Sequence, residues 1–463
     1  MSATTSQPNH LIVLVHGLAD TLHAWDNCIY ELRKTEPASD FLLFASAVNA
    51  RFRTHDGFDE CGKRLANEIL ELVHQHTQLT KLSVIGHSMG GMIARYAMGI
   101  LFNPLDGTIC GLKPAHFVTL ATPHLGLTVD DGPGQVPFIA WAGKIPLLGR
   151  SVKSALQGVG HWVARTVFSG TGRHFLALDG GPGELPLLML LAMDAPDKGQ
   201  YFYSALAAFA SRACYGNVGR DHWVSWENAT IRSSEDLPSI PPDIVRKGRG
   251  VVRADPPDAG MGSTTWQASS AVTTADAAIR ALQPLIAELT ASGAVPCESG
   301  CSEVLQCPVP ASITAASSTQ AAAGATTGTT GASTKEEGLE SGSEALQCVL
   351  QGAGGVPGGQ AAEGEALLER AVERAVESPS QVVEFALERL RRLPWRRVDV
   401  SFAGARLGSA HNNIQATRWT NRVGFSVLEH VRGHLRDVDQ LLPRPAAGET
   451  GWEAPTGGGP EAA

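Results

Sequence analysis

The stretch from Leu82 to Tyr96 limits the possible folds of this chain more than any other part of the sequence. An apolar run typical of a buried β-strand comes first, a serine flanked by Gly86 and Gly90 follows, and the next residues are helix-forming. A serine on a sharp turn with a strained backbone leaves no room for side chains at those two glycine positions. The pattern is the G-x-S-x-G nucleophile elbow in its strand–turn–helix context. It predicts that Ser88 is a nucleophile above the edge of a sheet, and the alternative is a glycine-rich turn without chemistry.

The first third of the chain alternates short apolar runs with segments of helical periodicity. This alternation is typical of βαβ units in a parallel sheet that helices cover on both faces. Besides the strand of the elbow, we expect strands at 11–15, 41–48, 116–121, 212–218 and 398–402, and helices at 24–34, 58–76 and 419–441. The sequence therefore predicts an α/β fold with a mostly parallel sheet flanked by helices.

The composition changes after the strand at 116–121, and we interpret residues 127–200 as a helical cap insertion. No Asp or Glu occurs between Gly132 and Leu178. The basic residues of this segment are Lys144, Arg150, Lys153, Arg165 and Arg173. Two interpretations stay open. The segment is either a lid that docks on an anionic lipid surface, such as a membrane or a lipid droplet, or an ordinary cap whose apolar face is buried on the domain.

The chain divides into four predicted segments. Residues 1–238 form the first part of the core, including the cap, and residues 394–442 supply its last strand, a histidine loop and the final helix. Residues 239–393 contain a low-complexity tract, 310–334, that cannot bury enough apolar surface to fold alone. Between Asp255 and Glu369 there are thirteen acidic residues against two basic ones. We therefore expect 239–393 to be a largely disordered acidic insertion with helical patches, and 443–463 to be a disordered tail.

The partners of Ser88 must come from elsewhere in the chain. A serine hydroxyl needs a histidine to accept its proton and a carboxylate to orient that histidine. In sheets of this kind the chain order is Ser, then Asp or Glu, then His, each on a turn after a strand. Asp221 and His411 satisfy both conditions, since each comes a few residues after a predicted strand downstream of Ser88. The predicted triad is Ser88, Asp221 and His411.

Other titratable residues fit this order less well. His16 precedes Ser88, and His124 precedes the acid, so we expect His124 to be structural or to line a pocket. His222 adjoins Asp221, but neighbouring residues on one turn usually point apart. The remaining candidates are His430 and His434, which we expect on a solvated helix face, Asp399 inside a strand, and Asp179 and Asp194 within the cap.

Two backbone N–H groups must stabilise the oxyanion of an acyl-transfer intermediate. One comes from the residue after the nucleophile and one from the loop after the first strand, which here are Met89 and Leu18. This chemistry requires no metal and no organic cofactor. The eight cysteines form no C-x-x-C pair, and the cluster Cys297, Cys301 and Cys307 lacks zinc-site spacing. We therefore expect reduced thiols and no metal site.

Five segments in this order resemble the lipase-like serine esterases of eukaryotes, a family long catalogued as a domain of unknown function within the α/β-hydrolases. The segments are His10–Leu18, Gly86–Gly91, Leu120–Gly126, Asp221–Val224 and Ala410–Ile414. The resemblance covers residues 11–231 and 395–441. It implies an α/β-hydrolase fold, without the two strands that usually lead the sheet, and hydrolysis of lipid acyl esters by Ser88, Asp221 and His411. The long insertion between the acid and the histidine departs from the family pattern.

These observations predict a serine esterase whose partner is a lipid or ester substrate. A thioesterase or acyltransferase would use the same triad, and a catalytically inactive hydrolase scaffold would bind lipid or protein instead. The absence of a basic stripe with interleaved aromatic residues argues against nucleic-acid binding. The longest apolar run, Leu185 to Met193, is too short to cross a bilayer, and the early first strand leaves no room for a signal peptide. We expect a cytoplasmic protein with peripheral contact to membranes.

Overall fold

The structure of the protein is a computed structural model. It describes residues 7–34, 41–128, 133, 135, 169–180, 185–262, 379–403, 405 and 410–441. All of them lie in one of two compact units of the chain, which consists of residues 1–271 and 366–463.

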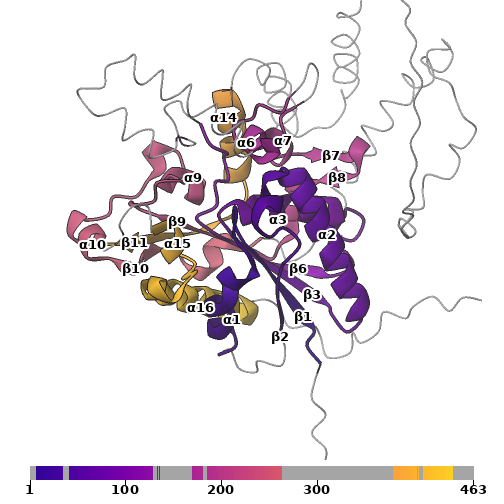
Figure 1. Ribbon diagram of the computed structural model, residues 1–463, viewed down its shortest axis with the longest axis horizontal. Coiled ribbons are helices and arrows are strands. Elements are labelled where there is room, and N and C mark those ends of the chain that lie inside the picture. The colour runs from indigo at the N-terminus through magenta and orange to yellow at the C-terminus, as the bar shows by residue number, and fades with distance from the viewer. Residues whose placement is uncertain are drawn as a thin grey trace, which may run out of the picture. The chain divides into compact units, whose positions relative to one another are not determined.

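A seven-stranded sheet forms the centre of this unit (Figure 1). Its strands are β1 (His10–Val15), β2 (Phe41–Ala45), β3 (Lys81–His87), β6 (Lys113–Leu120), β9 (Ser211–Asn217), β10 (Arg249–Ala254) and β11 (Arg396–Phe402). Their spatial order is β10-β11-β9-β6-β3-β1-β2, and all neighbours are parallel except β10 and β11. The expectation of a mostly parallel sheet flanked by helices is confirmed.

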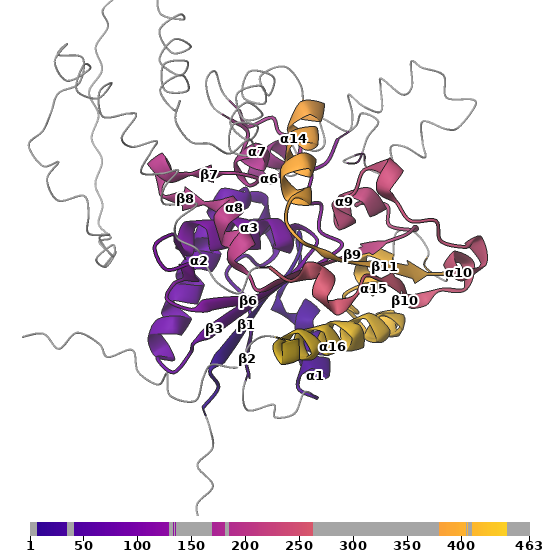
Figure 2. The same ribbon diagram turned by 180° about the vertical axis from the view of Figure 1, so that it is seen from behind.

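Each central strand is buried on both faces because its side chains alternate between two apolar cores. In β1, Leu11 and Val13 belong to one core, whereas Ile12 and Leu14 belong to the other. The first core is covered by α2 (Phe58–Gln75), α3 (Met89–Leu101), α8 (Phe202–Ala208) and α14 (Pro379–Arg391). The second is covered by α1 (Asp26–Leu32) and α16 (Phe425–Leu441), which lie together on the opposite face of the sheet (Figure 2).

Shorter elements connect these layers. The helices among them are α6 (Ser169–Phe175), α7 (Leu187–Leu190), α9 (Trp226–Thr230), α10 (Pro242–Lys247) and α15 (Ala410–Asn413). Two small hairpins pair β4 (Phe102–Asn103) with β5 (Thr108–Ile109) and β7 (Asp194–Ala195) with β8 (Gln200–Tyr201). Single 3-10 turns are η1 (Leu22–Trp25), η3 (Arg51–His55), η4 (Pro196–Lys198), η5 (Ser234–Asp236), η6 (Pro257–Gly260) and η7 (Trp419–Gly424).

Both ends of the expected insertion 239–393 contain regular structure. Helix α10 and strand β10 follow residue 238, and helix α14 precedes residue 394. Strand β10 forms the edge of the sheet through antiparallel pairing with β11, from which more than a hundred residues separate it in the chain. The expected boundaries at 238 and 394 therefore fall inside the folded core, because such long-range pairing leaves no local pattern in a segment rich in Pro and Gly. The remainder of the insertion, 263–378, and the expected tail lie outside the described residues.

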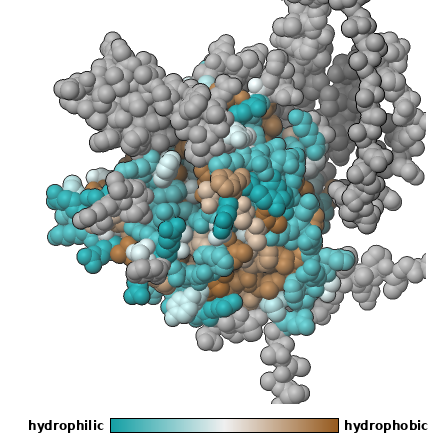
Figure 3. Space-filling model, in the orientation of Figure 1, coloured by the Kyte–Doolittle hydropathy of each residue, from teal (hydrophilic) through white to brown (hydrophobic). Residues whose placement is uncertain are grey.

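The surface of the described residues is largely hydrophilic on the face drawn in Figure 3, and its broadest apolar area lies in the lower middle part of the view. None of the helices within the described ranges is long and apolar enough to cross a membrane.

Candidate active site

The turn after β3 has the geometry of a nucleophile elbow. Ser88 connects β3 directly to α3 and has a φ of 53° and a ψ of −128°, a conformation that non-glycine residues rarely adopt. A Cβ atom at Gly90 would lie 2.1 Å from the Val15 carbonyl oxygen, and one at Gly86 would lie 2.6 Å from the Cα of Gly91. Glycines are therefore required at both positions because α3 packs directly against β1 and β3.

The structure brings the three predicted triad residues together. The Nε2 atom of His411 lies 2.8 Å from the Ser88 hydroxyl, and its Nδ1 atom lies 2.9 Å from Oδ2 of Asp221. Ser88 follows β3, Asp221 follows β9, and His411 lies on α15 after β11. Because β3, β9 and β11 run in the same direction, their carboxyl ends meet at one edge of the sheet. Because the three residues lie at this common edge, they form one continuous series of hydrogen bonds although they are far apart in the sequence.

Asp221 is buried, and all of its acceptor positions face donors. Oδ1 accepts hydrogen bonds from the backbone N–H groups of Trp223 and Val224, and Oδ2 accepts from Nδ2 of Asn217 in addition to His411. Burial raises the pKa of Asp221, but the nearby His411 and these hydrogen bonds outweigh burial, so its pKa lies below the ordinary value. Asp221 therefore carries the negative charge that can orient and stabilise a protonated His411.

His87 supports the loop that carries His411, a contact that no sequence pattern indicated. Its Nε2–H donates to the backbone carbonyl of His411 at 2.8 Å, and the centres of the two rings are 5.0 Å apart. Burial lowers the pKa of His87 to about 3, so this ring is neutral at physiological pH. A carbonyl can only accept a hydrogen bond, so the proton of the neutral ring lies on Nε2. Asn217 is the second site residue that the sequence analysis missed.

The loop after β1 lies against the elbow. A Cβ atom at Gly17 would approach that of Ser88 to 3.0 Å. The Gly17 carbonyl accepts a hydrogen bond from Nδ1 of His16 at 3.0 Å and a longer one from the N–H of Asp20 at 3.4 Å. Because a trans peptide is planar, the N–H of Leu18 points opposite to that fixed carbonyl. His16 thus fixes the orientation of the peptide that bears the N–H of Leu18.

The N–H of Met89 is the first of α3. The first N–H groups of a helix have no partner within the helix, and they lie at the positive end of its dipole. Met89 and Leu18 therefore offer backbone donors on two elements that meet at Ser88.

The other candidates have structural partners. His222 is exposed, and Nε2 of the buried His124 lies 2.9 Å from the Thr119 hydroxyl. Asp399 is buried in β11 and forms ion pairs with Arg232 and Arg253. Asp179 accepts a hydrogen bond from the N–H of Leu187, and Asp194 accepts bonds from Ser204.

The expectation of a solvated helix face for His430 and His434 is wrong. His434 is buried against Arg396, whose guanidinium donates to Nδ1 of His434 at 2.8 Å, and His430 Nδ1 lies 2.9 Å from the Tyr215 hydroxyl. The physical reason is that α16 packs against the sheet through Val427 and Val431, so that His434 is buried on this face and His430 is half-buried at its border.

Most of the predicted basic cap lies outside the described residues, including Lys144, Arg150, Lys153 and Arg165. Its described elements α6 and α7 lie beside α2 and α3. The buried guanidinium of Arg95 on α3 donates to the carbonyls of His124 and Leu191, which ties the elbow helix to the residue after α7. Among the described residues, no three His, Cys, Asp or Glu side chains are grouped as metal ligands would be.

The sheet order and the elbow after a central strand, with the acid and the histidine after later strands, define an α/β-hydrolase. Residues 5–233 match the family model described as "Putative serine esterase (DUF676)".

Curated relatives carry lipase names. The chain is similar to "Putative lipase ROG1" of Saccharomyces cerevisiae, with 29% identity over 32% of this chain and 22% of that protein. It is also similar to "Putative lipase C4A8.10" of Schizosaccharomyces pombe, with 23% identity over 50% of this chain and 27% of that protein. The chain thus spans less than a third of the length of these relatives.

Similar solved structures include a phospholipase PlaB from Legionella pneumophila and an extracellular α/β-hydrolase from a Paenibacillus species. The first is 17% identical with a TM-score of 0.22, over 32% of this chain and 29% of the other. The second is 13% identical with a TM-score of 0.24, over 47% of this chain and 82% of the other.

Proposed function

We propose that the protein is a serine esterase that hydrolyses lipid acyl esters through Ser88, His411 and Asp221. The observation that carries this proposal is the continuous hydrogen-bonded chain from the Ser88 hydroxyl through both nitrogens of His411 to the buried Asp221. The lipase names of the curated relatives support a lipid substrate.

The geometry supports a mechanism in two steps. Ser88 Oγ attacks the ester carbonyl while Nε2 of His411 accepts its proton, and Asp221 holds the ring with Nε2 directed at the serine. The N–H groups of Leu18 and Met89 stabilise the oxyanion of the tetrahedral intermediate. His411 then gives the proton to the leaving alcohol, which produces an acyl-enzyme. A water molecule, deprotonated by His411, releases the acid and restores Ser88.

A thioesterase or an acyltransferase would form the same acyl-enzyme and differ in the leaving group or the acceptor. Incubating the purified chain with acyl esters, acyl thioesters and an alcohol acceptor distinguishes these activities by their products. We expect the free fatty acid from a lipid ester as the main product. Cytoplasmic localisation and contact of the cap with a membrane or lipid-droplet surface stay predictions from the sequence.

The first test is covalent labelling by a fluorophosphonate, which reacts only with an activated serine. We expect the wild-type chain to be labelled and to hydrolyse a lipid ester, and Ser88→Ala to lose both properties with at least a thousandfold fall in turnover, the scale of losing an activated nucleophile. The matched control is Ser234→Ala, since Ser234 is an exposed serine outside the site. Wild-type protein that takes no label, or equal labelling of Ser88→Ala, would rule out this function.

A further inference from the structure

The imidazole of His87 lies between two of the loops that meet at Ser88. On one side its Nε2–H donates to the backbone carbonyl of His411 at 2.8 Å. On the other side the ring lies against the loop after β1, since a Cβ atom at Gly17 would lie 3.4 Å from Nδ1 of His87. The residue is only 3% exposed, which is too little to contact a substrate. His87 therefore contacts the loop of the base and the loop of the oxyanion donor from below the site.

The bond to His87 restrains His411 at a different point from the bond to Asp221. Asp221 holds the ring through Nδ1, whereas His87 holds the backbone carbonyl. Among the described residues, no other donor contacts that carbonyl. Helix α15 is a single turn of four residues, and a helix of that length depends on its neighbours for its position. Both restraints are therefore needed to keep Nε2 of His411 2.8 Å from the Ser88 hydroxyl.

The donor to His411 is neutral, which suits its place beside a histidine that becomes charged. The centres of the two rings are 5.0 Å apart. When His411 accepts the proton of Ser88, a lysine or arginine at this distance would oppose the new positive charge. Burial lowers the pKa of His87 to about 3, so this ring stays neutral while His411 is protonated. A buried histidine thus supplies an N–H donor without an opposing charge.

His87 makes this contact at a cost in stability. Because its proton lies on Nε2, its Nδ1 is an acceptor, and that atom is buried without a hydrogen-bond partner among the described residues. An apolar side chain of similar size would avoid this cost. Nε2 of His16 and Nδ1 of His124 are also buried without a partner. His16 follows β1, His87 ends β3 and His124 follows β6, so all three lie at the edge of the sheet that carries Ser88.

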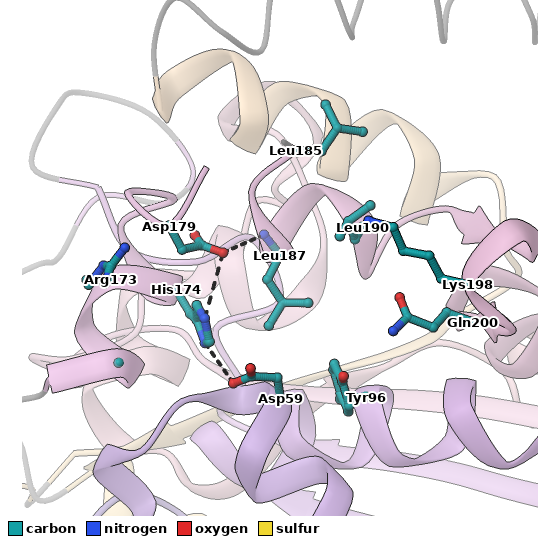
Figure 4. Close-up of a pocket in the computed structure, with 11 residues that line it drawn as sticks. Asp59, Tyr96, Arg173, His174, Asp179, Leu185, Leu187, Leu190, Lys198 and Gln200 are labelled. Atoms are coloured by element: carbon teal, nitrogen blue, oxygen red, sulfur yellow. Dashed lines mark hydrogen bonds and ion pairs between the residues drawn. The ribbon is translucent and has the colours of Figure 1, made fainter. Parts of the chain in front are cut away.

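Two histidines away from the elbow have the opposite arrangement. Both ring nitrogens of His116, at the other edge of the sheet, lie within 3.3 Å of side-chain oxygens of Ser211 and Asp439. In a cavity beside α2 and α3, His174 has a carboxylate on either side of its ring, 3.8 Å and 3.7 Å from its nitrogens (Figure 4). An unpaired buried nitrogen calls for an explanation, and at His87 its place beside the triad points to a role in function.

We propose that His87 is a positioning residue, whose Nε2–H anchors the backbone of His411 so that its ring stays within reach of Ser88, and which increases turnover while it lowers stability. The inference rests on the proposed esterase function, because the place of His411 matters to turnover only when His411 transfers the proton of Ser88. A displacement of about 1 Å at reacting groups can reduce a rate by about a hundredfold. Since His87 does not touch the substrate, the effect belongs to kcat and not to KM.

Three variants test the donor. His87→Phe and His87→Leu replace it with apolar side chains of different size, so that one remains informative if the other does not fold. His87→Gln keeps a neutral N–H near the position of Nε2. We expect kcat on a lipid ester to fall by about ten- to a hundredfold in the two apolar variants with little change in KM, and His87→Gln to recover most of the loss. The urea midpoint of the apolar variants should change little, because the lost hydrogen bond is offset by removal of the unpaired Nδ1.

His10→Phe is the matched control. His10 is also 3% exposed, and its Nε2 lies 2.7 Å from the Ser83 hydroxyl at the opposite edge of the sheet. This variant should have a lower urea midpoint and the wild-type kcat, which is the pattern that a purely structural His87 would share. Wild-type kcat in His87→Phe and His87→Leu, or a loss in His87→Gln as large as in His87→Phe, would overturn the proposal.

Hydrogen–deuterium exchange tests the contact without turnover. The amides of residues 410–416 should exchange faster in His87→Phe than in the wild type, and near the wild-type rate in His87→Gln. Unchanged exchange in His87→Phe contradicts the proposal whatever the esterase activity, and so does faster exchange with an unchanged kcat. If the wild-type chain takes no fluorophosphonate while exchange responds as expected, the proposed esterase function fails and the anchoring of His411 by His87 stands.

Discussion

Asp221 is the residue on which the charge balance of the candidate triad depends. Its carboxylate has two backbone donors on one oxygen and Asn217 with His411 on the other, so its orientation is fixed from both sides. An asparagine at this position would keep an acceptor for the backbone N–H groups. It would remove the negative charge and would present an N–H or a weaker acceptor to Nδ1 of His411. The neutral ring would then favour the tautomer whose Nε2 carries the proton and cannot accept one from Ser88.

For Asp221→Asn we therefore expect turnover to fall by at least about a hundredfold, while the melting temperature changes little. Turnover, fluorophosphonate labelling rate and thermal unfolding are measured on the same preparation. Asp26→Asn, at a largely exposed carboxylate outside the site, is the control and should retain wild-type turnover. Near-wild-type activity of Asp221→Asn would show that another carboxylate orients His411, or that none does.

The sequence allowed Ser88, Asp221 and His411 to be found because their order and their positions after strands follow from the chemistry and the sheet. It gave no signal for His87 or Asn217, since their contacts depend on where α15 and the loop after β9 lie in space. It was misleading for His434, because spacing along a helix shows which residues share a face but not which face is buried. That face is set by the packing of α16 on the sheet.

At the scale of elements, the elbow depends on the close approach of α3 to β1. Gly90 is the point of closest approach, since a Cβ atom there would lie 2.1 Å from the Val15 carbonyl oxygen and 2.6 Å from that of His16. Both atoms belong to the backbone of a buried strand end and cannot move aside as a flexible side chain would. An added methyl group would therefore push α3 away from β1, and with it the N–H of Met89.

We expect Gly90→Ala to lower the free energy of unfolding by about 1–3 kcal/mol, the cost of overpacking a filled interior, and to reduce fluorophosphonate labelling. Chemical denaturation measures the first effect and gel fluorescence the second. The matched control is Gly433→Ala on α16, where a Cβ atom would meet no heavy atom within 4 Å. That change should be neutral or stabilising, because alanine is the better helix former. A Gly90→Ala protein as stable and as reactive as wild type would contradict the packing described for the elbow.

Helices and strands were predicted correctly where their hydrophobic periodicity lies within the element itself. They were missed where the element forms only by pairing with a strand that is far away in the sequence. The apolar run of β1 and the helical spacing of α2 and α16 each carry their own signal. Strand β10 does not, because its six residues include two arginines and a glycine and acquire their strand geometry from β11. The cap is a different case, since the charge pattern from which it was predicted lies mainly outside the described residues.

At the scale of the molecule, buried histidines connect the sheet to α16 at the edge opposite the candidate active site. His10 on β1 lies 2.7 Å from the Ser83 hydroxyl, and His116 on β6 lies 2.9 Å from the Ser211 hydroxyl. His434 completes the group from α16. The cluster begins at the amino ends of the parallel strands, whereas Ser88, Asp221 and His411 follow their carboxyl ends.

This cluster makes stability depend on pH in a defined direction. Burial lowers the pKa of His10 to about 3 and places that of His434 well below its ordinary value, so the folded state binds fewer protons than the unfolded state below pH 6.5. The contribution of each of these two histidines to the free energy of unfolding is complete above about pH 6.5. It is lost as the pH falls toward 3, by about 1.4 kcal/mol per pH unit for each histidine. The lowered pKa of Asp439 acts only at a lower pH, below its ordinary value of 3.8.

Urea unfolding between pH 7 and pH 5 measures this loss without interference from Asp439. We expect the free energy of unfolding to fall steadily over that interval, and His10→Gln, which keeps a hydrogen-bonding side chain but cannot titrate, to reduce the slope by about 1.4 kcal/mol per pH unit. His74→Gln is the control, because His74 is exposed on α2 and its replacement should keep the wild-type slope. If the wild-type stability is constant from pH 7 to pH 5, or if His10→Gln and His74→Gln have the same slope, the buried cluster does not set the acid sensitivity of the fold.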